Sequence, residues 1–173
     1  MTEKTYNVLF LCTGNSARSI IGEVLLHHYG ASRFKAFSAG SHPKGDVHPM
    51  ALKTLAGLGF SIEGQRSKSW NEFTGPGAPE FDFIFTVCDN AAGETCPVWI
   101  GHPMTAHWGI EDPAAVEGEG QQQAFMDAVR FLRRRIESFL ELPLAQLDAV
   151  ATARKLKEIG QTDGATHTAE KTQ

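Results

Sequence analysis

The sequence predicts an α/β protein in which a parallel β-sheet lies between two layers of helices, a three-layer sandwich. Short apolar runs alternate with segments whose apolar residues recur at helical spacing. This order favours a parallel sheet with helices on both faces and right-handed crossovers. In addition, two of the apolar runs end at cysteines, Cys12 and Cys88. Because ligands bind beyond the carboxyl ends of parallel strands, both thiols should lie at the functional edge of the sheet.

Each expected element follows from its local pattern. Four consecutive apolar residues at 8–11 indicate a buried strand, and apolar residues at helical spacing over 20–28 indicate the helix that follows. The apolar run 81–87 indicates a third strand in the same way. The full set comprises strands at 8–11, 32–38, 81–87 and 105–108, helices at 20–28, 49–58 and 122–142, and a short helix around Trp70 and Phe73.

The chain is expected to divide after residue 142. Residues 1–142 should form the main domain, and residues 143–173 a C-terminal extension. Pro143 is expected to open a last helix that reaches about Ile159. The remaining residues, 160–173, are polar and rich in Thr and Gly, which predicts a disordered tail.

Composition narrows the class of protein. With 173 residues, 42% hydrophobic, the chain can bury one core. A formal net charge of −4 gives no reason to expect nucleic acid or an anionic membrane as a partner. Arg133, Arg134 and Arg135 are therefore interpreted as a solvated helix face. The sequence shows neither a signal peptide nor an apolar run of membrane-spanning length, and three cysteines do not suit a disulfide framework. We expect a cytoplasmic protein with reactive thiols.

The segment from Cys12 to Ser19 predicts an oxyanion site. Turn-forming residues connect the first strand to a helix, so loop amides and the helix N-terminus should surround a bound anion with partial positive charge. Arg18 adds a planar charged fork that matches two oxygens of such an anion. The same field predicts a lowered pKa for Cys12, with Ser19 donating its hydroxyl to the sulfur. The alternative is a buried structural cysteine.

This segment resembles the phosphate-binding loop of low-molecular-weight protein tyrosine phosphatases and of the arsenate reductases that share their fold. The resemblance spans roughly residues 6–142 and implies the strand order 2-1-3-4. It implies that Cys12 is the nucleophile and Asp112 the general acid, although an Asp before Pro113 also caps helices. The substrate-binding residues implied by the loop are Thr13, Gly14, Asn15, Ser16, Ala17, Arg18 and Ser19.

Cys88 and Cys96 frame a segment of small and polar residues. A zinc site with His102 and His107 is one interpretation, but the seven intervening residues exceed the usual spacing. A thiol relay fits better, and it resembles the thioredoxin-coupled arsenate reductases. That resemblance implies arsenate as substrate, thioredoxin or a low-molecular-weight thiol as reductant, and no metal or organic cofactor.

Two other functions stay open: a phosphatase acting on phosphotyrosine or a small phosphate ester, and an oxyanion-binding or redox-sensing module. The residues after Asp112 and Pro113 are Ala114 and Ala115, where phosphatases of this fold carry tyrosines. This departure disfavours an aryl substrate. Some related reductases bind potassium near the loop, and here we expect Lys68 to take the place of that ion.

Overall fold

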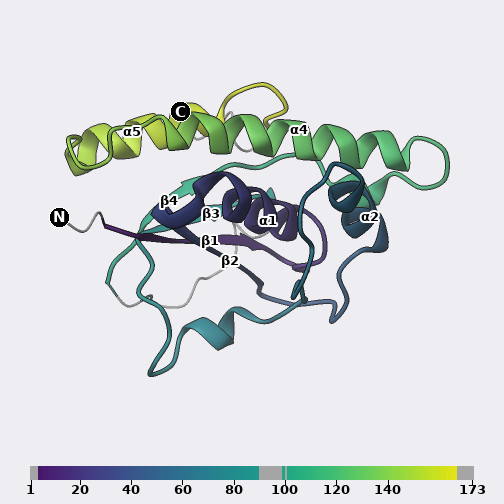
Figure 1. Cartoon of the computed structure of the whole chain (residues 1–173), viewed down its shortest axis with the longest axis horizontal. Coiled ribbons are helices and arrows are strands. Elements are labelled where there is room, and N and C mark those ends of the chain that lie inside the picture. The colour runs from purple at the N-terminus through teal and green to yellow at the C-terminus, as the bar shows by residue number, and fades with distance from the viewer. Residues whose placement is uncertain (1–3, 90–98, 100, 167–173) are drawn as a thin grey trace.

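Four parallel strands form a single sheet in the computed structural model, which describes residues 4–89, 99 and 101–166 (Figure 1). The strands are β1 (Tyr6–Cys12), β2 (Phe34–Gly40), β3 (Phe83–Thr86) and β4 (Met104–His107). Their order is β2-β1-β3-β4, and all pairs are parallel. The predicted fold class and strand order are therefore confirmed.

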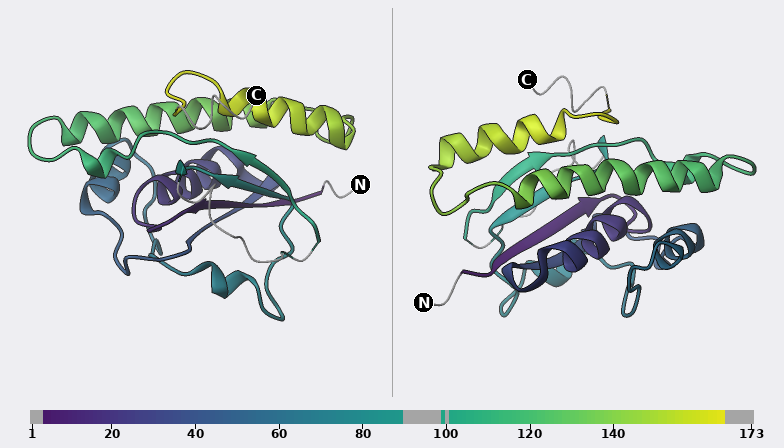
Figure 2. Two further views of the ribbon diagram at one scale, coloured as in Figure 1. Left: turned by 180° about the vertical axis from the view of Figure 1, so that it is seen from behind. Right: turned by 45° about the horizontal axis from the view of Figure 1, so that its top comes forward.

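Helices and helical turns cover both faces of the sheet. The α-helices are α1 (Arg18–Gly30), α2 (Pro49–Gly57), α4 (Gln121–Leu140) and α5 (Ala149–Gly160). The 3₁₀ turns are η1 (Ala31–Arg33), η2 (Trp70–Phe73) and η3 (Pro113–Ala115). Figure 2 shows α4 and α5 on one side of the sheet and the segment that carries η2 on the other. No helix among the described residues is long and apolar enough to cross a membrane.

Alternating side chains of the strands separate the core into two layers. Val8 and Phe10 of β1 pack with α1, α4 and α5. Leu9 and Leu11 lie on the opposite face of the sheet, in the cluster against which η2 packs. In the larger layer, Phe85 stacks on Trp108 with ring centroids 3.7 Å apart. Burial on both faces explains why β1 is a continuous apolar run.

Parallel register brings the two predicted thiols to one edge. β1 and β3 pair with Leu11 opposite Thr86, and the Val87 N–H donates to the Leu11 carbonyl over 2.9 Å. The chain therefore leaves both strands at the same height, which places Cys12 and Cys88 side by side. Gly40, at the end of β2, lies so close to the loop that a methyl group there would collide with the Thr13 carbonyl.

The last helix begins later than the sequence indicated. α5 starts at Ala149, not at Pro143, because Asp148 caps it by accepting from the Ala151 N–H over 2.7 Å. Pro143 instead begins a turn that the Gln146 N–H closes over 2.9 Å. On the sheet side, the indole of Trp108 donates to the Leu156 carbonyl over 3.0 Å, which fixes α5 beside β4.

Arg135 is buried, which corrects its interpretation as part of a solvated face. Its side chain is 0% exposed, whereas Arg133 and Arg134 are exposed as predicted. The guanidinium donates to the carbonyls of Phe131, Gly160, Thr162 and Asp163. Burial lowers the pKa of Arg135 to about 10, so it remains a cation at neutral pH and complements the carboxyl end of α5.

Residues 160–166 are ordered around Arg135, so the prediction of disorder is wrong for this part of the tail. Ala165 forms an antiparallel bridge with Ile110, and the Thr166 N–H donates to the Gly109 carbonyl over 3.1 Å. The sequence pattern missed this because the contacts are made by backbone groups and by side chains far away in the sequence, Arg135 and Asp89. Residues 167–173 lie outside the described part of the chain.

Replacing Arg135 with Met should destabilise the protein. The variant leaves the carbonyls at the end of α5 without their buried donor, at a cost of about 2–3 kcal/mol in unfolding free energy. Chemical denaturation monitored by circular dichroism measures this change, with Arg134→Met as the matched control on the exposed face. Equal stability of the two variants would contradict the assigned role.

Candidate active site

The loop after β1 turns its carbonyls away from Cys12. The carbonyls of Thr13, Gly14 and Ser16 accept from the backbone N–H groups of His42, Lys44 and His48 over 2.8–3.0 Å. Because the N–H of each following residue points opposite to the carbonyl of the same peptide plane, the loop amides face inward. The Asn15 N–H shows this directly, since it donates to Cys12 Sγ over 3.2 Å. The loop is thus preorganised for an anion.

Asn15 and Ser19 hold the sulfur from behind. Asn15 is fully buried with φ 44°, a left-handed conformation that Asn tolerates well. Its amide Nδ2 donates to Ser19 Oγ over 2.8 Å, which leaves the Ser19 hydroxyl proton free to point at Cys12 Sγ, 2.9 Å away. Both residues therefore support Cys12, and neither lines the pocket.

The remaining loop residues and Arg18 surround a cavity of about 250 Å³. Arg18 is anchored by a hydrogen bond from Nη1 to the Ile110 carbonyl over 2.9 Å, and its Nη2 lies 3.7 Å from Asp112 Oδ2. The cavity is lined by Cys12, Thr13, Gly14, Ser16, Ala17, Arg18, His42, Lys44 and Asp112. Its size and donors suit a tetrahedral oxyanion.

Asp112 caps a helical turn and also lines the pocket. Its Oδ1 accepts from the Ala114 N–H over 3.0 Å and caps η3, while its other oxygen faces Arg18. The carboxylate is 41% exposed, so it can exchange protons with solvent. Its position on the pocket wall suits a general acid.

Cys88 lies directly beside the Cys12 loop. The Thr13 N–H donates to Cys88 Sγ over 3.3 Å, and both cysteines are buried. A hydrogen bond with Cys88, together with burial, raises the pKa of Cys12 well above its ordinary value, and the Ser19 hydroxyl opposes this. The predicted lowering of the Cys12 pKa is therefore wrong here, because a second thiol in contact competes with the loop.

Cys96 lies outside the described residues. His107 of β4 was a candidate ligand in the alternative zinc site. Its two ring nitrogens contact other side chains instead: Nδ1 lies 2.7 Å from Thr86 Oγ1, and Nε2 lies 2.8 Å from Asp89 Oδ1. In the described part of the chain, no three His, Cys, Asp or Glu side chains are grouped to hold a metal ion.

Lys68 occupies the back of the loop, as the sequence predicts. Its ammonium group lies 3.0 Å from the Arg66 carbonyl, 3.2 Å from Ser38 Oγ and 3.6 Å from Glu23 Oε1. The Lys68 N–H also donates to Asn15 Oδ1 over 2.9 Å, which connects this cation to the support of Cys12. Burial lowers the pKa of Lys68, and Glu23 opposes the shift.

Two pocket residues were missed at the level of sequence. His42 and Lys44 come from the loop after β2 and line the cavity beside Gly14. Their position just after the end of β2, at the same edge of the sheet as Cys12, is the sequence signal that could have identified them. Lys44 adds positive charge to the rim that Arg18 begins, and His42 adds an imidazole ring.

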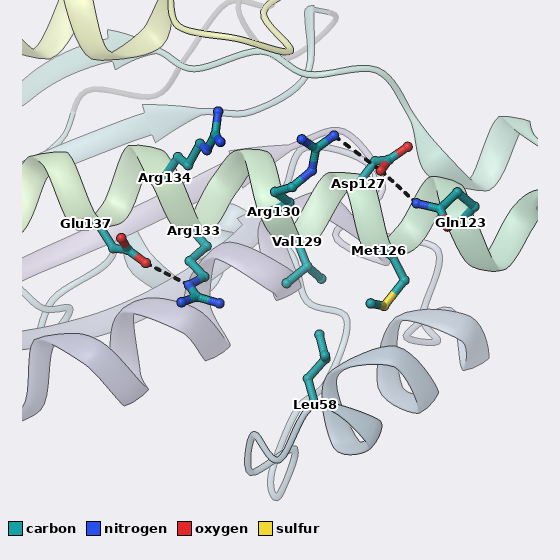
Figure 3. Close-up of a pocket in the computed structure, with 9 residues that line it drawn as sticks. All are labelled: Leu58, Gln123, Met126, Asp127, Val129, Arg130, Arg133, Arg134 and Glu137. Atoms are coloured by element: carbon teal, nitrogen blue, oxygen red, sulfur yellow. Dashed lines mark hydrogen bonds and ion pairs between the residues drawn. The ribbon is translucent and has the colours of Figure 1, made fainter.

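A second hollow, of about 360 Å³, lies on α4 near the carboxyl end of α2 (Figure 3). Two of its three arginines are paired with carboxylates of the same helix: Arg133 with Glu137 over 2.7 Å and Arg130 with Asp127 over 3.4 Å. Apolar contact there comes from Leu58 and its neighbours on α4. None of the predicted site residues lines this hollow, whereas Cys12, Arg18 and Asp112 all line the pocket at Cys12.

The chain belongs to the low molecular weight phosphotyrosine protein phosphatase family, whose model matches residues 7–153. Solved structures agree with this assignment. A tyrosine phosphatase of Escherichia coli K30, crystallised with sulphate, shares the fold with a TM-score of 0.64 at 22% identity, over 79% of this chain and 97% of that one.

Within the family, the chain is similar to arsenate reductases. It is 35% identical over 136 residues to an arsenate reductase of Bacillus subtilis, covering 78% of this chain and 94% of the relative. An arsenate reductase solved in a phosphate-binding state aligns with a TM-score of 0.66 at 25% identity, over 79% of this chain and 97% of that one. A thioredoxin-dependent arsenate reductase of Corynebacterium glutamicum aligns with a TM-score of 0.59 at 25% identity, over 84% and 66%.

Removing Cys88 should lower the pKa of Cys12. In Cys88→Ala the thiol that raises the pKa is gone, so Cys12 should become reactive at lower pH, whereas Ser19→Ala should shift reactivity to higher pH. The measurement is the pH dependence of iodoacetamide labelling, quantified on the peptide that contains Cys12. A midpoint that stays unchanged in Cys88→Ala would show that the two thiols do not interact.

Proposed function

We propose that the protein is an arsenate reductase that works through a relay of Cys12, Cys88 and Cys96. The observation that carries this proposal is the position of Cys88 Sγ at the Cys12 loop, where the Thr13 N–H donates to it. A phosphatase needs one cysteine in the oxyanion pocket, whereas a reductase needs a second sulfur within reach of the first. The arsenate reductases among the relatives support the same choice of activity.

The first step is nucleophilic attack by Cys12 on arsenate. Inward-facing amides and Arg18 bind the oxyanion oxygens, and Asp112 gives a proton to the oxygen that departs as water. The product is a covalent bond between Cys12 Sγ and arsenic. The hydrogen bonds from Asn15 and Ser19 stabilise the sulfur as the anion from which attack begins.

The second step uses Cys88. Its sulfur attacks Cys12 Sγ, the sulfur–arsenic bond breaks, and its electron pair stays on arsenic, which leaves as arsenite. Two thiols are thereby oxidised to a Cys12–Cys88 disulfide while As(V) is reduced to As(III). This step requires the buried contact between the two sulfurs.

The third step regenerates the nucleophile. Cys96 attacks Cys88, frees Cys12 and leaves a Cys88–Cys96 disulfide for an external thiol to reduce. We propose thioredoxin as that reductant, supported by the thioredoxin-dependent relative, and the cytoplasm as the compartment, where thiols are kept reduced. A low-molecular-weight thiol is the alternative reductant.

An aryl-phosphatase function is less well supported. None of the described residues that line the pocket is Phe, Tyr or Trp, and the segment after Asp112 is Pro113, Ala114 and Ala115. An aromatic ring of a substrate would therefore have little to stack on. Arsenate, which consists of oxygens around one atom, needs no such platform.

The Cys96→Ser variant should accumulate the Cys12–Cys88 disulfide. With arsenate, thioredoxin, thioredoxin reductase and NADPH, wild type should form arsenite continuously, whereas Cys96→Ser should stop after one turnover because thioredoxin has no exposed disulfide to reduce. Arsenite quantification and disulfide mapping by mass spectrometry check this, with Cys12→Ser as the inactive control. Continuous turnover by Cys96→Ser would exclude Cys96 from the relay, because thioredoxin would then reduce the Cys12–Cys88 disulfide directly.

A further inference from the structure

Asp89, the residue after Cys88, is held by two side chains from distant parts of the chain. Its Oδ1 accepts from Thr166 Oγ1 over 2.7 Å and contacts His107 Nε2 over 2.8 Å. The other ring nitrogen of His107 contacts Thr86 Oγ1 over 2.7 Å. Side-chain contacts thus restrain the backbone on both sides of Cys88, through Thr86 before it and Asp89 after it.

The C-terminal extension delivers Thr166 to this position. Arg135 binds the carbonyls after α5, Ala165 bridges to Ile110, and the Thr166 N–H donates to the Gly109 carbonyl. Ile110 is also the residue whose carbonyl anchors Arg18 over 2.9 Å. The segment 161–166 therefore reaches the edge of the sheet where the catalytic groups lie.

Gly109 shows how tightly this cluster is packed. A Cβ atom at Gly109 would lie 2.6 Å from His107 Nε2 and 2.7 Å from both Asp89 Oδ1 and Thr166 Oγ1. Only a glycine allows the three side chains to meet. Three elements, the end of β3, the end of β4 and the C-terminal segment, thus converge on a single carboxylate.

This contact belongs to a part of the chain beyond the matched family region. The family model ends at residue 153, and Thr166 follows it. Arsenate reductases of Shouchella clausii and Bacillus subtilis are each matched over 94% of their own length by 78% of this chain. The extension therefore adds a contact to Asp89, the neighbour of the relay cysteine, from a residue beyond the family match.

We propose that Asp89 is a positioning residue for the relay and that the C-terminal extension, through Thr166, holds it in place. The inference rests on the relay proposed above, and it concerns the step in which Cys88 Sγ attacks Cys12 Sγ. Neither Asp89 nor Thr166 takes part in bond formation. Together they restrict the backbone at Cys88, so that its sulfur stays in line with Cys12 when the sulfur–arsenic bond breaks.

The test compares Thr166→Val with Thr166→Ser, each in the Cys96→Ser background. Reduced protein is mixed with arsenate in the absence of reductant and quenched with an alkylating agent, and the Cys12–Cys88 disulfide is quantified over time. Thr166→Val, which keeps the shape but lacks the donor, should form the disulfide about tenfold more slowly. Thr166→Ser should restore the parental rate.

Two controls separate positioning from a general loss of structure. Thr162→Val makes the same change in the same segment at a hydroxyl that bonds the Ile159 carbonyl instead of Asp89, so its rate should equal that of the parent. Protection of Cys12 from iodoacetamide by inorganic phosphate should be the same in Thr166→Val and the parent, because the pocket is unchanged.

The outcomes distinguish this inference from the proposed function. If the Cys96→Ser parent forms no Cys12–Cys88 disulfide, the relay itself is wrong and the positioning role falls with it. If the parent forms the disulfide and Thr166→Val forms it equally fast, the relay stands and the inference is overturned. A slow Thr166→Val that also loses phosphate protection would assign Thr166 a structural role and overturn the inference as well.

Discussion

The contact between two buried thiols at the carboxyl ends of β1 and β3 determines how the rest of this site works. Cys12 Sγ accepts a hydrogen bond from the Asn15 N–H and lies 2.9 Å from the Ser19 hydroxyl oxygen. Cys88 Sγ accepts a hydrogen bond from the Thr13 N–H. The surrounding donors favour negative charge on sulfur, but two adjacent sulfurs cannot both be anions at low cost. This arrangement suits the relay proposed above, in which the two thiols together lose two electrons and become a disulfide.

The parallel sheet makes this contact possible, and cations secure its surroundings. Register between β1 and β3 sets the two cysteines at one height. Behind the loop, Lys68 binds Asn15, which in turn orients the Ser19 hydroxyl. Across α4, Arg135 binds the end of α5 and directs the chain back toward Gly109. These two buried cations thus stabilise opposite sides of one catalytic edge.

Much of the fold could be predicted because its signals are local. The apolar run of β1, the turn residues of the loop and the helical spacing of α4 lie in short windows of sequence. The structure places Cys12, Arg18 and Asp112 around one pocket. The Cys12 pKa, the burial of Arg135 and the pocket positions of His42 and Lys44 could not be predicted in this way. Each of these three properties depends on a partner residue far away in the sequence. The local sequence pattern around Cys12, Arg135, His42 or Lys44 contains no information about that partner.

In the proposed relay, Cys12 and Cys88 together supply the two electrons that reduce arsenate. Titration of free thiols after a single turnover measures this, using fully reduced wild-type protein, arsenate and no external reductant. Two of the three thiols should disappear for each arsenite released. Arsenite formation with one thiol lost, or loss of arsenate with all three thiols retained, would contradict the relay.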